Sequence, residues 1–443
     1  MSRRFVASLL GLLVLACQPT TGSDAVSDAK AGPGERTKDP VTELETPPKP
    51  ATPAAWVEPA RTHLLVHTLL PEQAIVSILP IALVEPPIGS SSMGPTSTRA
   101  SGPSVGVVQS RAAMPVSNWP DHFMGRLAHD GSDRYVAVAG GPEAWKLEVW
   151  SVEPSSGPSA SFELGTVSPA GLMMVGDQVF LGQGNAVGVV DLAAASPLRE
   201  LHRRPEMFAK AYDVFVRSGA WMIAIDDVVQ PIYADGFRIG PGAPERIQDF
   251  TLPSAINGSY YAGELVARGP DSGTLYLLLH YGIMDGHGHD LTALPIAAGK
   301  LEVDSGALLN GGGALSNPPV LEEHVDRGTH EPVKLIATEI YSEWTNLAYV
   351  RASEGGQARL WISAVERGLL ELPAAFDPST KASVIDLGGA VVDIMLIGGR
   401  GYALVNVEQP LARSELVELS PLPVGAAVER RTPLPGIFHR FVH

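Results

Sequence analysis

Residues 164–192 read LGTVSPAGLMMVGDQVFLGQGNAVGVVDL, and residues 387–420 read LGGAVVDIMLIGGRGYALVNVEQPLARSELVELS. In both stretches an apolar strand runs into a glycine turn, a second strand follows, and after a loop a third strand closes with an acidic residue and leucine. Short β-branched runs bounded by glycine, proline and polar turn residues indicate strands. The recurrence of the whole pattern indicates a repeated β unit.

The same alternation continues through most of the chain. YVAVAGGPEAWKLEVWSVEPSSG from Tyr135 resembles YVRASEGGQARLWISAVERG from Tyr349, each with a strand, a glycine turn and a strand centred on tryptophan. Taking the second strand of each unit as a marker gives the anchors Tyr135, Val179, Trp221, Leu275, Tyr349 and Tyr402. Most intervals are about 40 to 50 residues, the length of a four-stranded propeller blade. No segment shows sustained helical periodicity. The sequence therefore predicts an all-β fold, a β-propeller of six to seven blades, with seven preferred.

One interval, from Leu275 to Tyr349, is too long for a plain blade. It contains either a degenerate blade or a large insertion around residues 300–340.

The segment GDQVFLGQGNAVGVVDLAAASPL resembles the LVIVD repeat of bacterial surface propellers, in which a glycine turn and a strand precede a closing strand of the kind GLRIVDVSDP. Residues 176–180 match the turn and first strand, and residues 187–192 match the closing strand. SGAWMIAIDD and GGRGYALVNV resemble the first half of the repeat, whereas the closing aspartate and proline occur in only some units. The resemblance implies a propeller at the cell surface and carries no catalytic residues.

The N-terminus, MSRRFVASLLGLLVLAC, carries two arginines, an apolar run and the chain's one cysteine, Cys17. The run is within the length of a signal peptide and shorter than the roughly 20 residues of a membrane span. Its end, VLAC, resembles the bacterial lipobox, although Leu15 is bulkier than the residue usual there. The resemblance implies cleavage of residues 1–17 as a signal, lipidation of Cys17 and, with Gln18, sorting to the outer membrane of a Gram-negative bacterium. Exporting an unpaired thiol is otherwise unfavourable, because it invites intermolecular coupling.

The remaining chain divides by composition into three parts. Residues 18–60 are rich in Pro, Thr and Ala with few large apolar side chains, which predicts a disordered tether. Residues 61–104 contain a β-compatible segment and a Ser/Gly/Pro linker, and residues 105–443 contain the propeller repeats. The segment after residue 61 either completes the ring with the C-terminal IFHRFVH or packs on its outside.

The formal net charge of −16 excludes two classes of partner. Nucleic acids require clustered Lys and Arg to displace counterions, and anionic lipid surfaces attract basic rather than acidic proteins. We therefore expect contact with the membrane through the N-terminal lipid only.

Three motifs resemble sites but fit turns and packing better. Residues 102–106, GPSVG, match the nucleophile elbow, yet no strand-to-helix turn surrounds them. Residues 182–185, GQGN, lack the spacing and the lysine of phosphate-binding loops. The tryptophans of KLEVW and RLWIS recur at what we take to be equivalent blade positions. We expect them to pack between blades rather than to form a sugar platform.

The stretch HYGIMDGHGHD, residues 280–290, is the strongest candidate for a ligand site. His287 and His289 are two residues apart, so in an extended segment they lie on one side, and imidazole suits Zn, Cu or Ni. Asp285, Asp290 and His280 could add ligands to a divalent metal. The alternative is a polar inter-strand loop in which Gly and Asp serve the turn. The spacing matches neither the metallo-β-lactamase motif nor a calcium loop, and the remote residues that would complete a site are His324 and His330.

These patterns predict a lipid-anchored propeller of the cell envelope that binds or scaffolds protein or glycan partners, without catalysis or a cofactor. The alternative is a metal-dependent hydrolase or lactonase that uses propeller face loops. The acidic and amide side chains that such enzymes place at equivalent positions of several blades do not recur regularly here.

Overall fold

From β5 (Leu127–Ala128) to β28 (Ala426–Pro433), the described strands are grouped in consecutive sets of four, and each set forms one antiparallel sheet. We describe a computed structural model, in which the described residues belong to one compact unit, Ala55–His443. They are residues 61–70, 75–83, 103–112, 127–141, 143–194, 197–205, 212–226, 232–240, 242–252, 258–269, 272–283, 286–297, 300–301, 344–352, 356–365, 368–376, 382–407 and 412–443.

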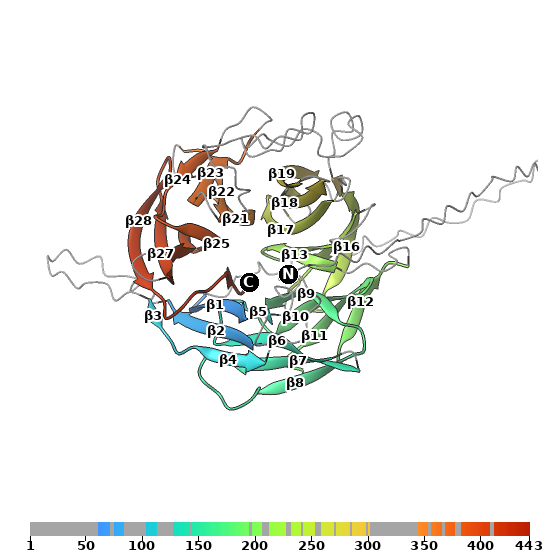
Figure 1. Cartoon of the computed structure of the whole chain (residues 1–443). Coiled ribbons are helices and arrows are strands. Elements are labelled where there is room, and N and C mark those ends of the chain that lie inside the picture. Colours follow the sequence, from blue (N-terminus) through green and yellow to red (C-terminus); the bar gives the residue numbers. More distant parts are fainter. Residues whose placement is uncertain are drawn as a thin grey trace, which may run out of the picture. The chain divides into compact units, whose positions relative to one another are not determined.

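Seven sheets form the blades of a β-propeller (Figure 1), which confirms the predicted fold class and the preferred blade count. The blades are numbered by their order around the ring. Blade 2 consists of β5 (Leu127–Ala128), β6 (Arg134–Gly141), β7 (Ala144–Ser151) and β8 (Ala160–Gly165), and blade 3 consists of β9 (Pro169–Val175), β10 (Gln178–Gln183), β11 (Ala186–Asp191) and β12 (Arg199–Arg203). Blade 4 consists of β13 (Tyr212–Ser218), β14 (Trp221–Asp226), β15 (Ile232–Arg238) and β16 (Glu245–Leu252).

Blade 5 consists of β17 (Gly258–Ala267), β18 (Gly273–Ile283), β19 (Gly286–Ala297) and β20 (Lys300–Leu301). Blade 6 consists of β21 (Trp344–Val350), β22 (Arg359–Ala364), β23 (Gly368–Pro373) and β24 (Ser383–Ile385). Blade 7 consists of β25 (Ala390–Ile397), β26 (Arg400–Val407), β27 (Arg413–Pro421) and β28 (Ala426–Pro433). The first strand of each blade is called the inner strand, because it lies nearest the middle of the ring (Figure 1).

Blade 1 closes the ring with strands from both ends of the described chain. It consists of β29 (Arg440–Phe441), β1 (His63–Leu70), β2 (Ile75–Ala82), β3 (Ser104–Val105) and β4 (Gln109–Ala112). The inner strand β29 pairs with β1, which places Phe441 opposite Val66. The segment after residue 61 therefore completes the ring. This moves the start of the propeller from residue 105, as composition suggested, back to β1.

The core consists of seven apolar clusters, and each cluster joins two neighbouring blades. Strands covered on both faces read as continuous apolar runs rather than as alternating ones. β14, with the sequence WMIAID, is accordingly buried along its whole length. Burial between blades is thus what turns the repeated sequence pattern into a ring.

Buried carboxylates on third strands add polar contacts between blades. Asp235 on β15 accepts hydrogen bonds from Arg204 Nε (2.7 Å), at the end of blade 3, and from Arg246 Nε (2.8 Å) and the Tyr212 hydroxyl of its own blade. Burial alone would raise the pKa of Asp235, but these donors outweigh it and hold the pKa below its usual range.

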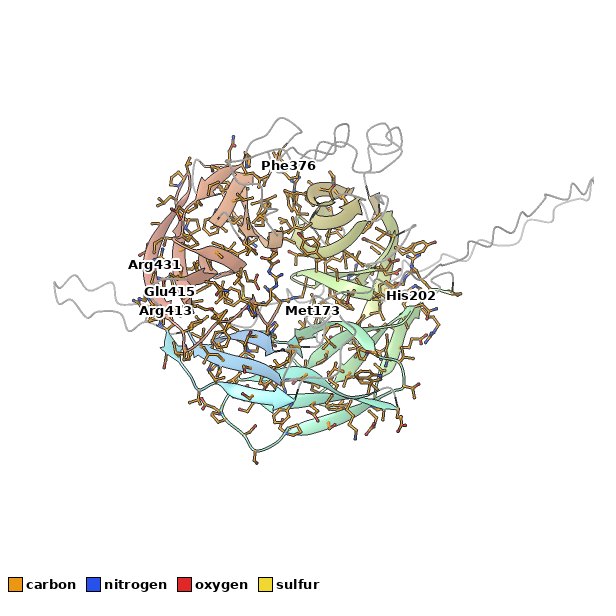
Figure 2. All side chains as sticks on the ribbon, viewed as in Figure 1. Met173, His202, Phe376, Arg413, Glu415 and Arg431 are labelled. Carbon is orange, nitrogen blue, oxygen red and sulfur yellow. The ribbon has the colours of Figure 1, made fainter. Side chains whose placement is uncertain are left out.

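Glu371 on β23 accepts from Arg359 Nη1 (2.7 Å) and Trp361 Nε1 (2.8 Å) within blade 6, and from the Gly425 backbone N–H (2.8 Å) of blade 7. On β27, Glu415 pairs with Arg413 (2.8 Å) and Arg431 (3.2 Å) at the outer side of blade 7 (Figure 2).

At Tyr349 the structure places the repeat one strand out of phase with the predicted pattern. Tyr135 lies on the second strand of its blade, β6, whereas Tyr349 lies on the inner strand β21. The matched tryptophans differ in the same way, with Trp150 on the third strand β7 and Trp361 on the second strand β22. The inner, second and third strands of a blade all carry buried apolar residues, so a local hairpin pattern does not reveal its place in the blade.

Candidate functional site

A central cavity of about 1220 Å³ lies among the inner strands of the propeller. Six successive inner strands, from β5 to β25, contribute to its wall, and the residues of β29 and those just after it close the remaining side. Figure 2 shows Met173 of β9 near the middle of the ring. This volume exceeds the 300 to 1,000 Å³ or so of typical ligand pockets.

β-Bulges recur in the inner strands that line the cavity. The pairing of inner and second strands skips one residue in each of β13, β17, β21 and β25. The skipped residues are Asp213, Tyr261, Thr345 and Val392. A bulge bends its strand and redirects the side chains beside it. The positions that follow these bulges hold Val214, Ala262, Asn346 and Asp393. The two polar residues among them, Asn346 and Asp393, lie on the neighbouring strands β21 and β25, near the place where the ring closes.

Asn346 and Asp393 form a hydrogen-bonded cluster with His443. Asn346 Nδ2 donates to Asp393 Oδ1 (2.9 Å) and lies 2.9 Å from His443 Nε2, which is itself 3.6 Å from Asp393 Oδ2. Backbone N–H groups of Ile394 (2.8 Å) and Phe441 (2.7 Å) also donate to the carboxylate. Asp393 is 1% exposed. One buried carboxylate therefore joins the inner strands of blades 6, 7 and 1.

The electrostatics of this cluster follow from its burial and its donors. Burial by itself would raise the pKa of Asp393. The hydrogen bond and charge of His443, the charge of Arg440 and the Phe441 N–H outweigh burial, and the pKa lies below its usual range. His67 of β1 also lines the cavity, and burial together with the charge of Arg440 lowers its pKa to about 3. Near neutral pH, Asp393 is ionised and His67 is neutral.

Hydroxyl groups support the backbone beneath the cluster. Thr345 Oγ1 donates to the Val392 carbonyl (2.7 Å) and lies 2.6 Å from Ser363 Oγ on β22. Arg440 Nη1 also donates to the Val392 carbonyl (2.7 Å). Because these contacts cross from blade to blade, they fix the spacing of β21, β25 and β29 at the cavity wall.

Aromatic side chains occupy another part of the cavity wall. Phe215, Tyr261 and Tyr349 come from β13, β17 and β21 and are half-buried. The Tyr349 ring stacks on Tyr276, with ring centroids 5.8 Å apart. The cavity therefore presents aromatic faces and hydrogen-bonding groups together, the combination typical of small-ligand sites.

The stretch of residues 280–290 lies mainly on strands rather than in a loop, which corrects the loop interpretation. His280 belongs to β18, and His287, His289 and Asp290 belong to β19. The backbone register pairs His280 with His289. The hairpin register therefore places His280 and His289 opposite each other on adjacent strands. Their spacing in the sequence could not show this.

The structure describes only the backbone of the four residues on these strands, and Asp285, His324 and His330 lie outside the described residues, as does Cys17. Among the described residues, no group of three or more His, Cys, Asp or Glu side chains is arranged to hold a metal ion. The proposed divalent metal site at residues 280–290 thus stays a prediction.

The other sequence motifs are turns or packing positions. Ser104 of the GPSVG motif is exposed on the short strand β3 and precedes no helix, so the elbow geometry is absent there. Gly182 of GQGN lies at the end of β10, where an added Cβ would come 1.7 Å from the Tyr212 carbonyl oxygen. Trp150 and Trp361 pack in clusters that join neighbouring blades, which confirms their packing role although not their equivalence.

Sequence reasoning missed the Asn346–Asp393–His443 cluster and the carboxylate contacts between blades. Asp393 lies in the run AVVDIMLI, where one acidic residue interrupts an apolar strand. Such an interruption is the signal that could have identified it, because a buried carboxylate requires partners. Its partners come from sequence positions far away and are visible only in the folded ring.

No helix in the part of the chain that the structure describes has both the length and the apolar character needed to cross a membrane. No protein-family model and no curated protein matches the sequence.

Solved structures similar to this chain include a proposed 6-phosphogluconolactonase from Bacteroides fragilis (10% identity, TM-score 0.45), which matches over 86% of this chain and 97% of that one. The dihydro-heme d1 dehydrogenase NirN has 11% identity and a TM-score of 0.40, covering 90% and 82% of the two chains. AztD from Citrobacter koseri has 10% identity and a TM-score of 0.36, covering 85% and 83%.

Proposed function

We propose that this protein is a lipid-anchored β-propeller of the cell envelope that binds a protein or glycan partner through its central cavity, without catalysing a reaction. The central cavity is the observation that carries the binding role. Its walls belong to inner strands held by apolar clusters on both sides, so the site is formed before a ligand arrives. A preformed site loses little conformational entropy on binding.

The chemistry of the cavity favours binding over acid–base catalysis by its buried groups. A general base works best when its pKa is near the operating pH. The pKa of Asp393 lies below its usual range, and that of His67 is about 3. Asp393 already accepts three hydrogen bonds from the protein. These two groups are therefore better suited to shaping the cavity than to moving protons.

A binding screen tests the cavity. The full chain, purified in nonionic detergent, would be screened against an array of glycans and peptides, and any ligand found would be titrated against Tyr261→Ala. Loss of this aromatic wall should weaken binding at least about tenfold, since stacked aromatic contacts and burial contribute more than about 1.4 kcal/mol. Phe162→Ala on the outer strand β8 is the matched control, with unchanged affinity expected. A ligand bound equally by wild type and Tyr261→Ala refutes the cavity as its site.

The anchor is supported by the lipobox-like end of the apolar N-terminal run at Cys17. Growth of the expressing bacterium with a radioactive fatty acid should label the wild-type protein and leave Cys17→Ala unlabelled. Stable membrane attachment of Cys17→Ala after a salt wash would contradict lipid anchoring. Fractionation of the wild type into outer membranes tests the proposed location.

A further inference from the structure

Arginine recurs beside one particular connection of the propeller, the one between the inner and second strands of a blade. Among the described residues, six of the seven blades carry an arginine within this connection or directly beside it. In blade order they are Arg61, Arg134, Arg217, Arg268, Arg351 and Arg400, which we call the arginine rim. Blade 3 has Gly176 and Asp177 at this place.

The topology puts these six positions on one face of the ring. Neighbouring inner strands lie side by side, and each pairs antiparallel with its second strand. The bulges occur near the beginning of the inner strands, so the connections to the second strands lie at the other end of the cavity. Arg217 precedes the turn between β13 and β14, and Arg400 follows the turn between β25 and β26.

Four members of the rim, Arg61, Arg217, Arg351 and Arg400, line the central cavity. Arg61 Nη1 lies 3.2 Å from the Met395 sulfur, and Arg217 Nη1 donates to the Gly219 carbonyl at 3.4 Å. Arg400 is half exposed and 3.9 Å from Glu418. A guanidinium has five N–H donors in a planar fork, so it can keep a protein contact and still bind an oxyanion.

The backbone beside Arg217 and Arg400 leaves these two members of the rim uncovered. The connections of blades 4 and 7 are tight turns with Gly219 (φ 58°), Gly398 (φ 57°) and Gly399 (φ 82°) in the left-handed region. Such glycine turns connect antiparallel strands with two residues and add no covering loop. Arg217 and Arg400 therefore line the cavity beside turns that do not cover them.

The charge of the cavity is divided between its ends. Asp213 and Asp393 lie near the beginning of the inner strands, opposite the arginine rim, and Glu264 is an acidic residue on the wall between them. Although the chain has a net charge of −16, distant surface charges are screened over about 8 Å at physiological ionic strength. An anion at the rim therefore experiences mainly the nearby side chains, where Arg134 pairs with Asp177 and Arg400 lies 3.9 Å from Glu418, whereas Arg61, Arg217 and Arg351 line the cavity.

We infer that the arginine rim binds the carboxylate or phosphate groups of an acidic saccharide whose remaining part occupies the central cavity. This inference rests on the proposed binding function and specifies its ligand class. Charge-assisted hydrogen bonds from arginine are bidentate with both carboxylate and phosphate. The half-buried aromatic wall holds the sugar rings, and Asn346, positioned by Asp393, faces the hydroxyl-bearing end of the ligand.

Calorimetric titration of the full chain in nonionic detergent tests the rim with three probes: trigalacturonate, inorganic phosphate and the neutral maltotriose. The wild type should bind trigalacturonate more tightly than maltotriose, and more weakly as salt is raised. The variant Arg217→Gln/Arg351→Gln should lose at least about tenfold in affinity for the anionic saccharide, because each charge-assisted hydrogen bond contributes about a tenfold factor or more. Its affinity for maltotriose should not change.

Arg203→Gln is the matched control, because this exposed arginine lies on the outer strand β12. Circular dichroism melting of each variant separates lost binding from lost folding. Trigalacturonate bound equally by the double variant and the wild type, or not bound by the wild type, overturns the rim. Phosphate that competes with trigalacturonate supports the rim as the oxyanion site, whereas binding of phosphate without trigalacturonate overturns the acidic saccharide as its ligand. Binding of maltotriose without any anion refutes the rim and leaves the proposed cavity function standing.

Discussion

Removal of the Asp393 carboxylate should weaken the closure of the ring. In Asp393→Ala the backbone N–H of Phe441, on the closing strand β29, loses the acceptor that it contacts at 2.7 Å. Asn346 Nδ2 loses one of its partners, the carboxylate oxygen at 2.9 Å. A buried donor left without an acceptor costs about 1 to 3 kcal/mol, and a hydrogen bond to a charged group contributes about 1.5 to 3 kcal/mol. We expect a total loss of about 3 kcal/mol at pH 7.

Thermal unfolding followed by circular dichroism measures this loss. With an unfolding entropy of about 2.1 cal/mol/K per residue, about 3 kcal/mol corresponds to a drop in Tm of about 4 °C for a domain of this length. Asp249→Ala is the control, because this acid is two-thirds exposed and its nearest arginine contacts are 3.8 to 3.9 Å. Its Tm should change by less than about 1 °C, since exposed ion pairs contribute little.

The pH dependence of the same difference tests its electrostatic origin. The folded-state pKa of Asp393 lies below its unfolded value, so its stabilisation is present above the unfolded pKa of about 3.9 and is lost as the pH falls through the folded pKa. The Tm difference between wild type and Asp393→Ala should therefore shrink below about pH 4. A Tm difference under 1 °C at pH 7, or one that is constant down to pH 3, would refute this account of the cluster.

Three further predictions concern other residues. His67 has a pKa lowered to about 3, so its contribution is present above pH 6.5 and is lost as the pH falls. The wild type should lose about 2 kcal/mol more than His67→Leu between pH 7 and pH 5, and parallel Tm curves would contradict this. Gly182→Ala should destabilise the fold by several kcal/mol in urea denaturation, because the new Cβ meets the Tyr212 backbone, whereas Gly141→Ala, with open space, should be near neutral. Elemental analysis of the purified full chain should find less than one equivalent of Zn, Cu or Ni; one equivalent that disappears in His287→Ala/His289→Ala would establish the metal site.

The sequence predicted the repeated strands because each blade is covered on both faces. A strand such as β14 must be apolar along its length to be buried between two neighbours, and this leaves a pattern that can be read locally. The glycine turns are equally local, because a tight hairpin requires positive φ at residues such as Gly176 (φ 58°). The blade pattern and the preferred blade count followed from these two signals.

The phase of the repeat and the ring closure could not be read in this way. The hairpins at Tyr135 and Tyr349 have the same local pattern although they occupy different places in their blades. Likewise, nothing in the sequence of β1 specifies pairing with the two residues of β29. Both depend on which segments meet after the blades have packed, which is a property of the whole ring.

In the candidate site too, some residues are suggested by the sequence and others are brought together only by the fold. The histidines of residues 280–290 attracted attention because they are close in sequence, whereas Asn346, Asp393 and His443 are brought together only by three neighbouring inner strands. The arginine rim is a similar case, since its members are scattered along the chain and share only a place in the blade.

By itself, the sequence determined that this chain forms buried strands in repeated units, because burial and turn geometry act on neighbouring residues. Only the tertiary structure decided how the ring closes, where the cavity lies and which charges surround it. Those features arise from contacts between segments far apart in the sequence: the hydrogen bond from Phe441 to Asp393 joins residues 48 positions apart, and β29 pairs with β1 from the opposite end of the described chain.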